Sequence, residues 1–151
     1  MLNEVVKYLN CRPGKVYVDG TLGGCGHARA ICQKIVPGGT LIGIDQDIDA
    51  ISNAETVLNN YANIHLFHGN FALLPEFMKQ IEIDSVDGIL LDLGLSQHQI
   101  EDSGRGFSFQ RDEPLDMRMD IQSRPTAEKL VNYLSQQELK KLFIDYGEEH
   151  R

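Results

Sequence analysis

Residues 16–28 read VYVDGTLGGCGHA, an order typical of a strand, a glycine-rich turn and the start of a helix. It begins with a short run of β-branched and aromatic residues that ends in Asp19, and it leads into a helix-compatible segment at residues 28–35. Four glycines lie between them, namely Gly20, Gly23, Gly24 and Gly26. Glycine suits such a turn because it adopts backbone conformations closed to other residues and lets a ligand approach the main chain. The N–H groups at the start of the helix would then face that ligand.

The composition bounds the class of protein. A chain of 151 residues forms one domain or part of a larger one, and 42% hydrophobic residues are enough for a folded core. The net charge is −8, from 14 basic and 22 acidic side chains. Such an acidic protein has no general affinity for phosphate backbones. Any contact with nucleic acid must therefore be local, or come from other parts of a longer protein.

The sequence contains no pattern typical of a membrane span, a signal peptide or a cysteine metal site. No apolar run approaches the roughly 20 residues of a membrane span, and the N-terminus lacks the pattern of a signal peptide. We expect a protein of the cytoplasm, or of an organelle matrix if a targeting segment has been removed, with no membrane partner. The cysteines Cys11, Cys25 and Cys32 are odd in number and include no close-spaced pair. They predict reduced thiols and no metal site.

Segments typical of strands and helices alternate along the first part of the chain. Strands are predicted at residues 15–18, 40–44, 64–68 and 86–91, and helices at 1–9, 28–35, 48–58 and 73–80. This alternation predicts an α/β fold: a mostly parallel sheet with helices on both faces and a site beyond the carboxyl ends of the strands. The polar residues at that edge are Asp19, Asp45, Asn70 and Asp92. We expect them to converge.

The pattern changes after the fourth predicted strand. Residues 93–125 are polar and show no clear period, and a segment of this length inside a compact domain usually has a function. Two helices are predicted to follow, at residues 126–134 and 135–146. Ser135 and Glu138 form a capping box at the start of the second helix, and Gly147 is its predicted stop.

The fourth predicted strand would leave an open, apolar sheet edge. A buried parallel strand without a partner favours aggregation or dimerisation, so the sheet is unfinished in this sequence. The charged residues 148–151 read like the middle of a chain. We expect the N-terminal part of a longer protein, and the exposed edge is a candidate contact for a homodimer.

The spacing between the glycine-rich turn and the second predicted strand indicates which class of ligand the turn binds. Asp45 follows Gly26 by nineteen positions, close to the ~20 of dinucleotide-binding folds, where an acid accepts hydrogen bonds from ribose hydroxyls. This spacing suits both NAD and S-adenosylmethionine. The acid at the first strand end, Asp19, is placed to hold an amino acid group, and the turn has more glycine than a pyrophosphate requires. These features favour S-adenosylmethionine, which has no pyrophosphate.

Several of these residues also have plain structural interpretations. Asp45 can be a strand-end residue or a helix cap, although Asp47 is better placed as the cap. Phe71 can cover an adenine ring or pack in the core. His27 can contact the cofactor or serve only the loop. Cys25 is better explained as a small residue in a tight turn than as a nucleophile.

An arginine-rich segment at residues 104–120 reads GRGFSFQRDEPLDMRMD. Its arginines are Arg105, Arg111 and Arg118, and its acids are Asp112, Glu113, Asp116 and Asp120. The arginines alternate with Phe107 and Phe109, a mixture suited to gripping phosphates and stacking on bases. The alternative is a loop held by its own ion pairs.

Four motifs together resemble one family. They are VDGTLGGCGHA at residues 18–28, GIDQD at 43–47, GILLDLGLS at 88–96 and RGFSFQRDEPLDMRMD at 105–120. TAEKLVN at 126–132 and YGEE at 146–149 continue the likeness, which spans nearly the whole chain. The sequence resembles the RsmH methyltransferases, also called MraW, which methylate the exocyclic amine of a cytidine in small-subunit ribosomal RNA.

The resemblance implies a class I, Rossmann-like methyltransferase that uses S-adenosylmethionine. With Gly24 of the same loop, the predicted cofactor-binding residues are Gly24, Cys25, Gly26, His27, Asp45, Phe71, Asp92 and Gln99. The sequence departs from the family pattern at two places. Glycine is usual where Cys25 stands, and Gln97-His98 replaces a Ser-Pro pair just before Gln99.

A domain organisation is also implied. Residues 1–125 would form the N-terminal part of the methyltransferase domain, with a long active-site loop at 93–125. Residues 126–151 would begin a helical insertion. Family members continue well past this point, which agrees with the unfinished sheet.

The implied reaction is attack of the cytosine amine on a sulfonium methyl group. The amine is a poor nucleophile because its lone pair is shared with the ring, so the enzyme must align the reacting atoms and accept the amine's hydrogen bond. We predict Asp92 near the reacting centre, with Asp116 and Arg118 as further catalytic candidates. The target base must be unstacked, and Phe107 or Phe109 would stack on it.

The sequence also predicts a partner and leaves two alternative functions open. The expected partner is small-subunit ribosomal RNA or a ribosomal particle. A non-catalytic RNA-binding or ribosome-assembly module is an alternative function, and an NAD-dependent oxidoreductase is a third. A preference for NADH over S-adenosylmethionine would favour the oxidoreductase.

Overall fold

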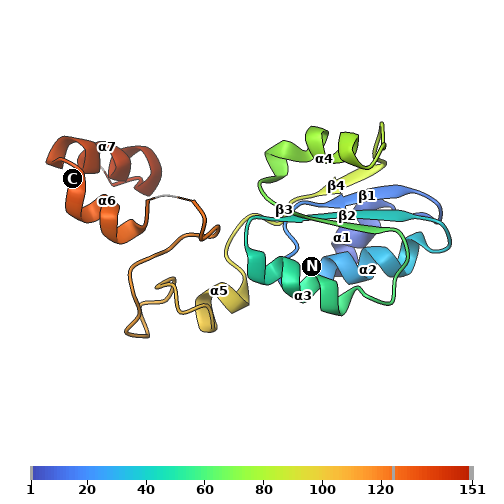
Figure 1. The fold of residues 1–151 in the computed structure, drawn as a ribbon, viewed down its shortest axis with the longest axis horizontal. Coiled ribbons are helices and arrows are strands. Elements are labelled where there is room, and N and C mark those ends of the chain that lie inside the picture. The colour runs from blue at the N-terminus through green and yellow to red at the C-terminus, as the bar shows by residue number, and fades with distance from the viewer. Residues whose placement is uncertain (1, 124, 150–151) are drawn as a thin grey trace. The chain divides into compact units, whose positions relative to one another are not determined.

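The computed structural model describes residues 2–123 and 125–149, which form two units. The first unit is Met1–His98 and the second is Gln99–Arg151. The first contains a sheet and its covering helices, and the second contains a long loop and two helices (Figure 1). Each unit is described by itself below.

The first unit is built on a four-stranded parallel sheet. Its strands are β1 (Val16–Asp19), β2 (Thr40–Asp45), β3 (Ile64–His68) and β4 (Gly88–Leu90). Their order across the sheet is β3-β2-β1-β4. The chain therefore begins at the central strand β1, continues outward through β2 and β3, and then returns to the other side of β1 to form β4. All three pairings are parallel, with Val18 opposite Ile42 on one side and Ile89 on the other. The predicted parallel sheet is confirmed.

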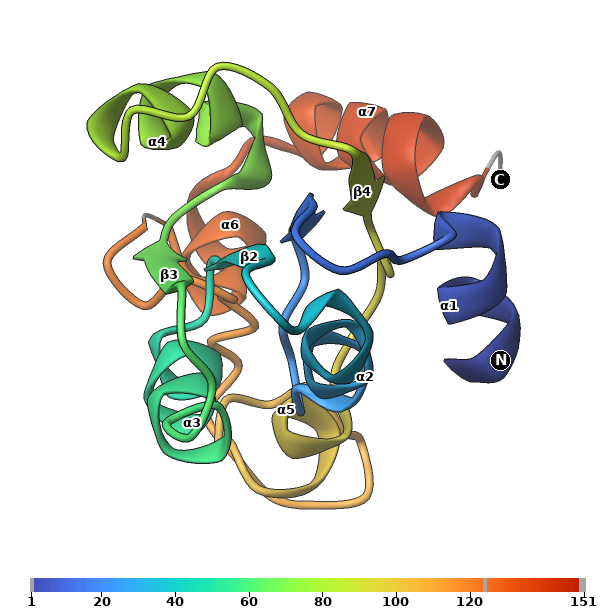
Figure 2. The same ribbon diagram turned by 90° about the vertical axis from the view of Figure 1, so that its right-hand side faces the viewer.

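Helices cover both faces of this sheet. α2 (Gly26–Ile35) and α3 (Ile48–Val57) lie on one face, and α4 (Leu74–Gln80) lies on the other (Figures 1 and 2). α1 (Leu2–Leu9) lies beside α2. The alternation follows from the strand connections, because each parallel strand needs a crossover and the crossovers here are helices.

Two apolar clusters form the core, one on each face. Successive strand residues point to opposite faces, so Tyr17 and Leu41 pack with α2 and α3 while Val18 and Ile42 pack toward α4. On the α4 side, the rings of Phe67 and Phe77 stack with their centroids 4.5 Å apart. The central strands are buried on both faces, which explains their continuous apolar sequences.

Some element boundaries differ from the sequence prediction. β4 spans Gly88–Leu90, not residues 86–91, because among the described strands it pairs only with β1. The predicted helix at residues 73–80 begins with a 3-10 turn at Phe71–Leu73, where the Asn70 side chain accepts a hydrogen bond from the Ala72 N–H. α4 itself then starts at Leu74.

A short helix, α5 (Gln97–Glu101), was not predicted. It lies across the boundary between the two units. Five residues are too few to establish a helical period, which is why residues 93–125 appear aperiodic in the sequence. None of the described helices is both long enough and apolar enough to cross a membrane.

The second unit contains the two helices predicted at the end of the sequence. They are α6 (Ala127–Tyr133) and α7 (Gln136–Gly147). The capping box of Ser135 and Glu138 is confirmed. The predicted stop is wrong by one residue, because Gly147 is still helical and Glu148 takes the left-handed conformation with φ 53°. The Glu148 N–H instead bonds to the Phe143 carbonyl.

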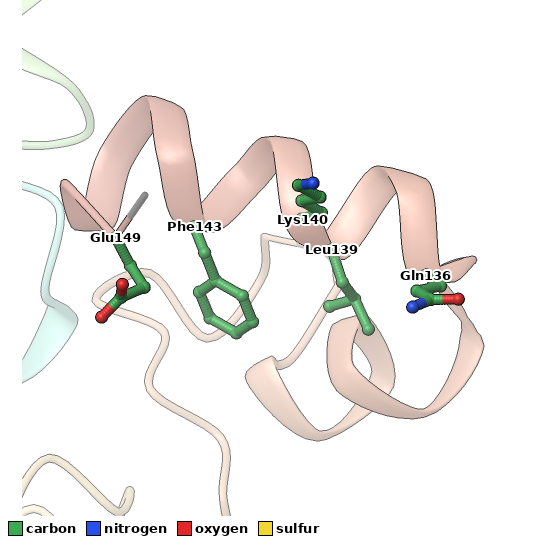
Figure 3. Close-up of a pocket in the computed structure, with 5 residues that line it drawn as sticks. All are labelled: Gln136, Leu139, Lys140, Phe143 and Glu149. Carbon is green, nitrogen blue, oxygen red and sulfur yellow. The ribbon is translucent and has the colours of Figure 1, made fainter. Parts of the chain in front are cut away.

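A hollow of about 460 Å³ lies along α7 (Figure 3). Its lining residues are Gln136, Leu139, Lys140, Phe143 and Glu149. All of them come from α7 and the residues after it, and none is a predicted site residue. The predicted site residues of the first unit lie instead at the carboxyl edge of the sheet.

Candidate functional site

The glycine-rich turn connects β1 to α2 and is held at both ends. The Gly20 N–H donates to the Leu90 carbonyl at 2.9 Å, and the Cys25 N–H donates to the Leu22 carbonyl at 2.7 Å. Leu22 is buried and anchors the turn over the sheet. A Cβ built at Gly24 or Gly26 would meet no atom within 4 Å, so the backbone at the start of α2 borders open space. A ligand can approach there.

Asp45, at the end of β2, binds this turn directly. One carboxylate oxygen accepts from the Gly23 N–H at 2.9 Å, and the other accepts from the Asp47 N–H at 2.9 Å. Asp47 in turn caps α3 by accepting from the Asp49 N–H, as predicted. Asp45 therefore fixes the glycine-rich turn to the second strand. This contact could not be read from the sequence, because it depends on strands being neighbours.

Asp19, at the end of β1, is fully buried with no exposed surface. Its Oδ1 accepts from the Thr21 N–H at 3.1 Å, whereas its Oδ2 has no hydrogen-bond partner. The pKa of Asp19 is raised to about 7, mainly by burial; the nearby carboxylates of Asp45 and Asp92 also raise it, and the hydrogen bond from the Thr21 N–H lowers it. Asp19 thus exchanges its proton near neutral pH.

Replacing Asp19 by asparagine should stabilise the protein above pH 7 and change little near pH 4. The folded-state pKa of about 7 lies above the ordinary value of 3.8, so stability falls as the pH rises from about 4 to 7 and then stays level. Asparagine has no proton to lose and keeps the shape. The gain at pH 8 should reach a few kcal/mol, with about 4 as the ceiling at ~1.4 per pKa unit.

Urea unfolding of both proteins at pH 5 and pH 8 measures this difference. Asp84→Asn, at an exposed carboxyl, is the matched control and should leave the pH dependence unchanged. An Asp19→Asn protein with the same pH slope as the parent would show that Asp19 is already ionised in the folded state at pH 5.

Asp92 follows β4 and contacts both the glycine-rich turn and the first turn of α2. Its backbone N–H donates to the Thr21 hydroxyl at 2.7 Å, and its Oδ2 lies 3.7 Å from the His27 Nδ1. The Asp92 side chain is 57% exposed, so it stays open to an incoming group. Thr21 was not among the predicted site residues. The only sequence feature that could have indicated Thr21 is its position in the glycine-rich turn, two residues after Asp19.

The end of β3 adds a third group of contacts. The Asn70 amide donates to the Gln46 side chain at 3.3 Å, and the His68 Nε2 lies 2.9 Å from the Gln46 carbonyl. Phe71 is half-buried, and its Cβ would be 3.2 Å from a Cβ placed on Gly20. The four strand-end residues therefore lie at one edge of the sheet, as predicted. The adenine contact of Phe71 stays a prediction.

Cys25 immediately precedes α2 in the left-handed conformation, with φ 62°. Its thiol is buried and accepts from the Asn53 amide at 3.6 Å, and burial raises its pKa to about 11. A thiol that stays protonated at neutral pH is a poor nucleophile. This supports the interpretation of Cys25 as a small residue in a tight turn, at a position whose conformation glycine would adopt without strain.

Gln99 and the arginine-rich segment belong to the second unit. Gln99 lies in α5 with 5% of its surface exposed, and its carbonyl accepts from the Ser103 hydroxyl at 2.7 Å. Of the pair that replaces Ser-Pro, His98 has its Nε2 3.3 Å from the Asp49 Oδ2. The proposed cofactor contact of Gln99 stays a prediction.

The arginine loop, defined here as residues 104–120, is tied by its own side chains. Arg105 is buried and donates from Nη1 to the Arg118 and Met119 carbonyls, at 3.1 and 2.9 Å. The Gly106 N–H donates to the Glu113 carboxylate at 2.9 Å. The Met117 N–H donates back to the Arg105 carbonyl at 2.8 Å. The loop therefore has a defined shape without regular secondary structure.

Asp116 and Arg118 form a two-pronged ion pair within this loop. The Arg118 Nε and Nη2 donate to the two Asp116 oxygens at 2.7 and 2.6 Å, and this pairing lowers the Asp116 pKa. Arg118 Nη1 also donates to the carbonyls of Ile121 and Ser123. These contacts agree with a loop held by its own ion pairs. A catalytic role for either residue stays a prediction.

Comparisons with known proteins agree with this architecture. The chain is 52% identical over 150 residues to "Ribosomal RNA small subunit methyltransferase H" of Desulforapulum autotrophicum, covering 99% of this chain and 48% of that protein. It is 51% identical over 150 residues to the protein of the same name in Geotalea uraniireducens, with the same two coverages. The chain thus spans about half the length of the curated relatives it matches.

Two solved structures share the fold at low sequence identity. A Clostridium thermocellum protein described as an rRNA methylase matches with a TM-score of 0.56 and 21% identity, over 63% of this chain and 52% of that one. A protein-L-isoaspartate O-methyltransferase matches with a TM-score of 0.53 and 13% identity, over 62% and 29%. The predicted Rossmann-like methyltransferase fold is confirmed.

The family assignment rests on the whole chain. The model of the MraW methylase family matches residues 1–151, which include the glycine-rich turn, the strand-end acids and the arginine loop. The chain therefore belongs to the MraW methylase family.

Proposed function

We propose that this chain supplies the S-adenosylmethionine-binding part of an enzyme that methylates the N4 amine of a cytidine in small-subunit ribosomal RNA. Membership of the MraW methylase family and the names of the curated relatives support the methyltransferase activity and its RNA. The observation that carries the proposal is the convergence of Asp45 and Asp92 on one glycine-rich turn.

The residues at this edge fit S-adenosylmethionine better than NAD. Three carboxylates, of Asp19, Asp45 and Asp92, are close enough for the other two to raise the pKa of Asp19. An anionic pyrophosphate would be repelled there, whereas a cationic sulfonium would be attracted. The buried Asp19 Oδ2, without a hydrogen-bond partner, is a further acceptor suited to a cationic ligand. The open backbone at Gly24 and Gly26 leaves room for it.

Each residue has a proposed task in binding or catalysis. Asp45 uses one lone pair on each oxygen for the Gly23 and Asp47 N–H groups, and the remaining lone pairs can accept the ribose hydroxyls. The cofactor supplies an electrophilic methyl group when bound. Asp92, held through its N–H by Thr21, accepts a hydrogen bond from the amine and helps to orient its lone pair.

Calorimetric titration of the chain with S-adenosylmethionine tests the cofactor. We expect one binding site, and no binding of NADH under the same conditions. Thermal unfolding of the same sample establishes that the protein is folded. A preference for NADH, or a folded chain that binds neither compound, would contradict the proposed site.

Labelled methyl transfer tests the acceptor. The protein is incubated with methyl-labelled S-adenosylmethionine and unmethylated small ribosomal subunits, and the RNA is digested to nucleosides. We expect the label in N4-methylcytidine. Label in another nucleoside would refute the proposed acceptor and leave the cofactor site standing. RNA binding without any transfer would favour the non-catalytic alternative.

A further inference from the structure

The two phenylalanines of the arginine loop differ sharply in their surroundings. Phe107 is half-buried, and the Arg105 guanidinium lies 5.6 Å from the centre of its ring. Because Arg105 is itself buried and bonded to the far side of the loop, Phe107 belongs to the loop's internal packing. Phe109 is 98% exposed. The sequence predicted either ring as a stacking partner, and in the structure only the Phe109 ring is fully accessible.

Local hydrogen bonds place Phe109 at the tip of a turn. The Gln110 N–H donates to the Ser108 hydroxyl at 3.2 Å, which closes the turn across Phe109. Below the turn, the loop is fixed by the Gly106–Glu113 hydrogen bond and the Asp116–Arg118 ion pair. The backbone that carries the ring is therefore already ordered, so binding a partner costs little backbone freedom and more of the contact energy is available for affinity.

We propose that Phe109 is a stacking platform for an unpaired base of the RNA that this protein binds. The inference rests on the proposed function and deepens it, because it names the side chain that contacts the base. An aromatic ring stacks on any base through its π-face, and Arg111, also exposed and two residues away, supplies a cation for a neighbouring phosphate.

The charge of the protein favours a base over the phosphate backbone as the main contact. With a net charge of −8, the chain cannot rely on general attraction to phosphates. Two of the loop's arginines already have partners within the loop, since Arg118 is paired with Asp116 and Arg105 donates to backbone carbonyls. Stacking on a neutral ring needs no net positive charge. It should also be less sensitive to salt.

The absence of tryptophan from the sequence allows a direct test. Phe109→Trp introduces a single indole at the proposed platform, and Tyr133→Trp places one at another exposed aromatic position, on α6, as the matched control. The probe is unmethylated small-subunit ribosomal RNA without protein, and its binding is followed separately by fluorescence anisotropy of the labelled RNA. We expect RNA to quench the emission of the indole at residue 109 and not at residue 133.

Side-chain variants distinguish stacking from general apolar contact. Phe109→Tyr should bind the RNA as the parent does, because the ring is kept. Phe109→Leu and Phe109→Ala should weaken RNA binding about tenfold or more, since each loses the π-face. Affinity for S-adenosylmethionine should be the same in all of them.

Each other outcome counts against a specific claim. RNA binding without quenching at residue 109, equal quenching at both positions, or parent-like affinity of Phe109→Leu would overturn the proposal. Quenching by whole small subunits but not by the protein-free RNA would assign Phe109 to a protein partner and also overturn it. A chain that binds S-adenosylmethionine but neither the protein-free RNA nor the small subunit refutes the RNA part of the proposed function, and the platform with it.

Discussion

Replacing Asp45 by alanine should lower the affinity for S-adenosylmethionine by about a hundredfold or more. Two losses combine in this variant. The ribose hydroxyls lose a charged acceptor, and a hydrogen bond to a charged group contributes about 1.5–3 kcal/mol. The Gly23 and Asp47 N–H groups lose their acceptor as well, so the glycine-rich turn is no longer fixed to β2.

Calorimetry measures the affinity, and thermal unfolding confirms that the variant still folds. Asp84→Ala is the control, because it removes the same charge from an exposed position. It should bind S-adenosylmethionine as the parent does. Undiminished affinity in Asp45→Ala would remove the ribose assignment, and equal losses in both variants would indicate a general effect of charge.

Replacing Gly106 by alanine should open the arginine loop. Gly106 has φ 75°, a left-handed conformation that costs roughly 1–2 kcal/mol for an L-residue. A Cβ there would also overlap the Pro114 carbonyl, a backbone group that cannot rotate away. Its N–H bond to Glu113 would be lost as the loop moves. We expect trypsin to cleave after Arg118 at least about tenfold faster than in the parent.

Gly104→Ala is the matched control for this variant. Gly104 has a similar φ of 67°, but a Cβ there would meet no atom within 4 Å. The comparison therefore separates the cost of the conformation from that of the overlap. Mass spectrometry of timed digests locates each cleavage. Equal protection at Arg118 in both variants would mean that the loop tolerates a side chain beside Pro114.

The sequence predicted features that depend on local pattern. The alternation of apolar segments predicted the parallel sheet, and strand-end placement predicted that Asp19, Asp45, Asn70 and Asp92 converge. Caps at Asp47 and Ser135 were also predictable, since each depends on a few neighbouring residues. These are the features for which the period of the pattern and the chemistry of the cap are sufficient.

Features that depend on tertiary contacts were not predictable. The Asp45 contact with Gly23 joins residues 22 positions apart, and the Thr21 contact with Asp92 joins residues 71 apart. The arginine loop shows the same limit, because its composition suits both RNA binding and internal ion pairs. Only the structure shows that Arg105 is buried within the loop and that Phe109 is exposed.

The position of β4 at the sheet edge bears on the order in which the fold forms. The contact of Val16 on β1 with Asp87, the residue just before β4, closes a separation of 71 residues, whereas the Arg105–Met119 contact closes only 14. Contacts between residues close in the sequence form faster than contacts between distant residues. The arginine loop can therefore take shape early, and β4, which among the described strands pairs only with β1, joins late. Among the described strands β4 also has the shortest pairing, three residues against β1, so fewer strand contacts place Asp92 than place Asp45 on β2.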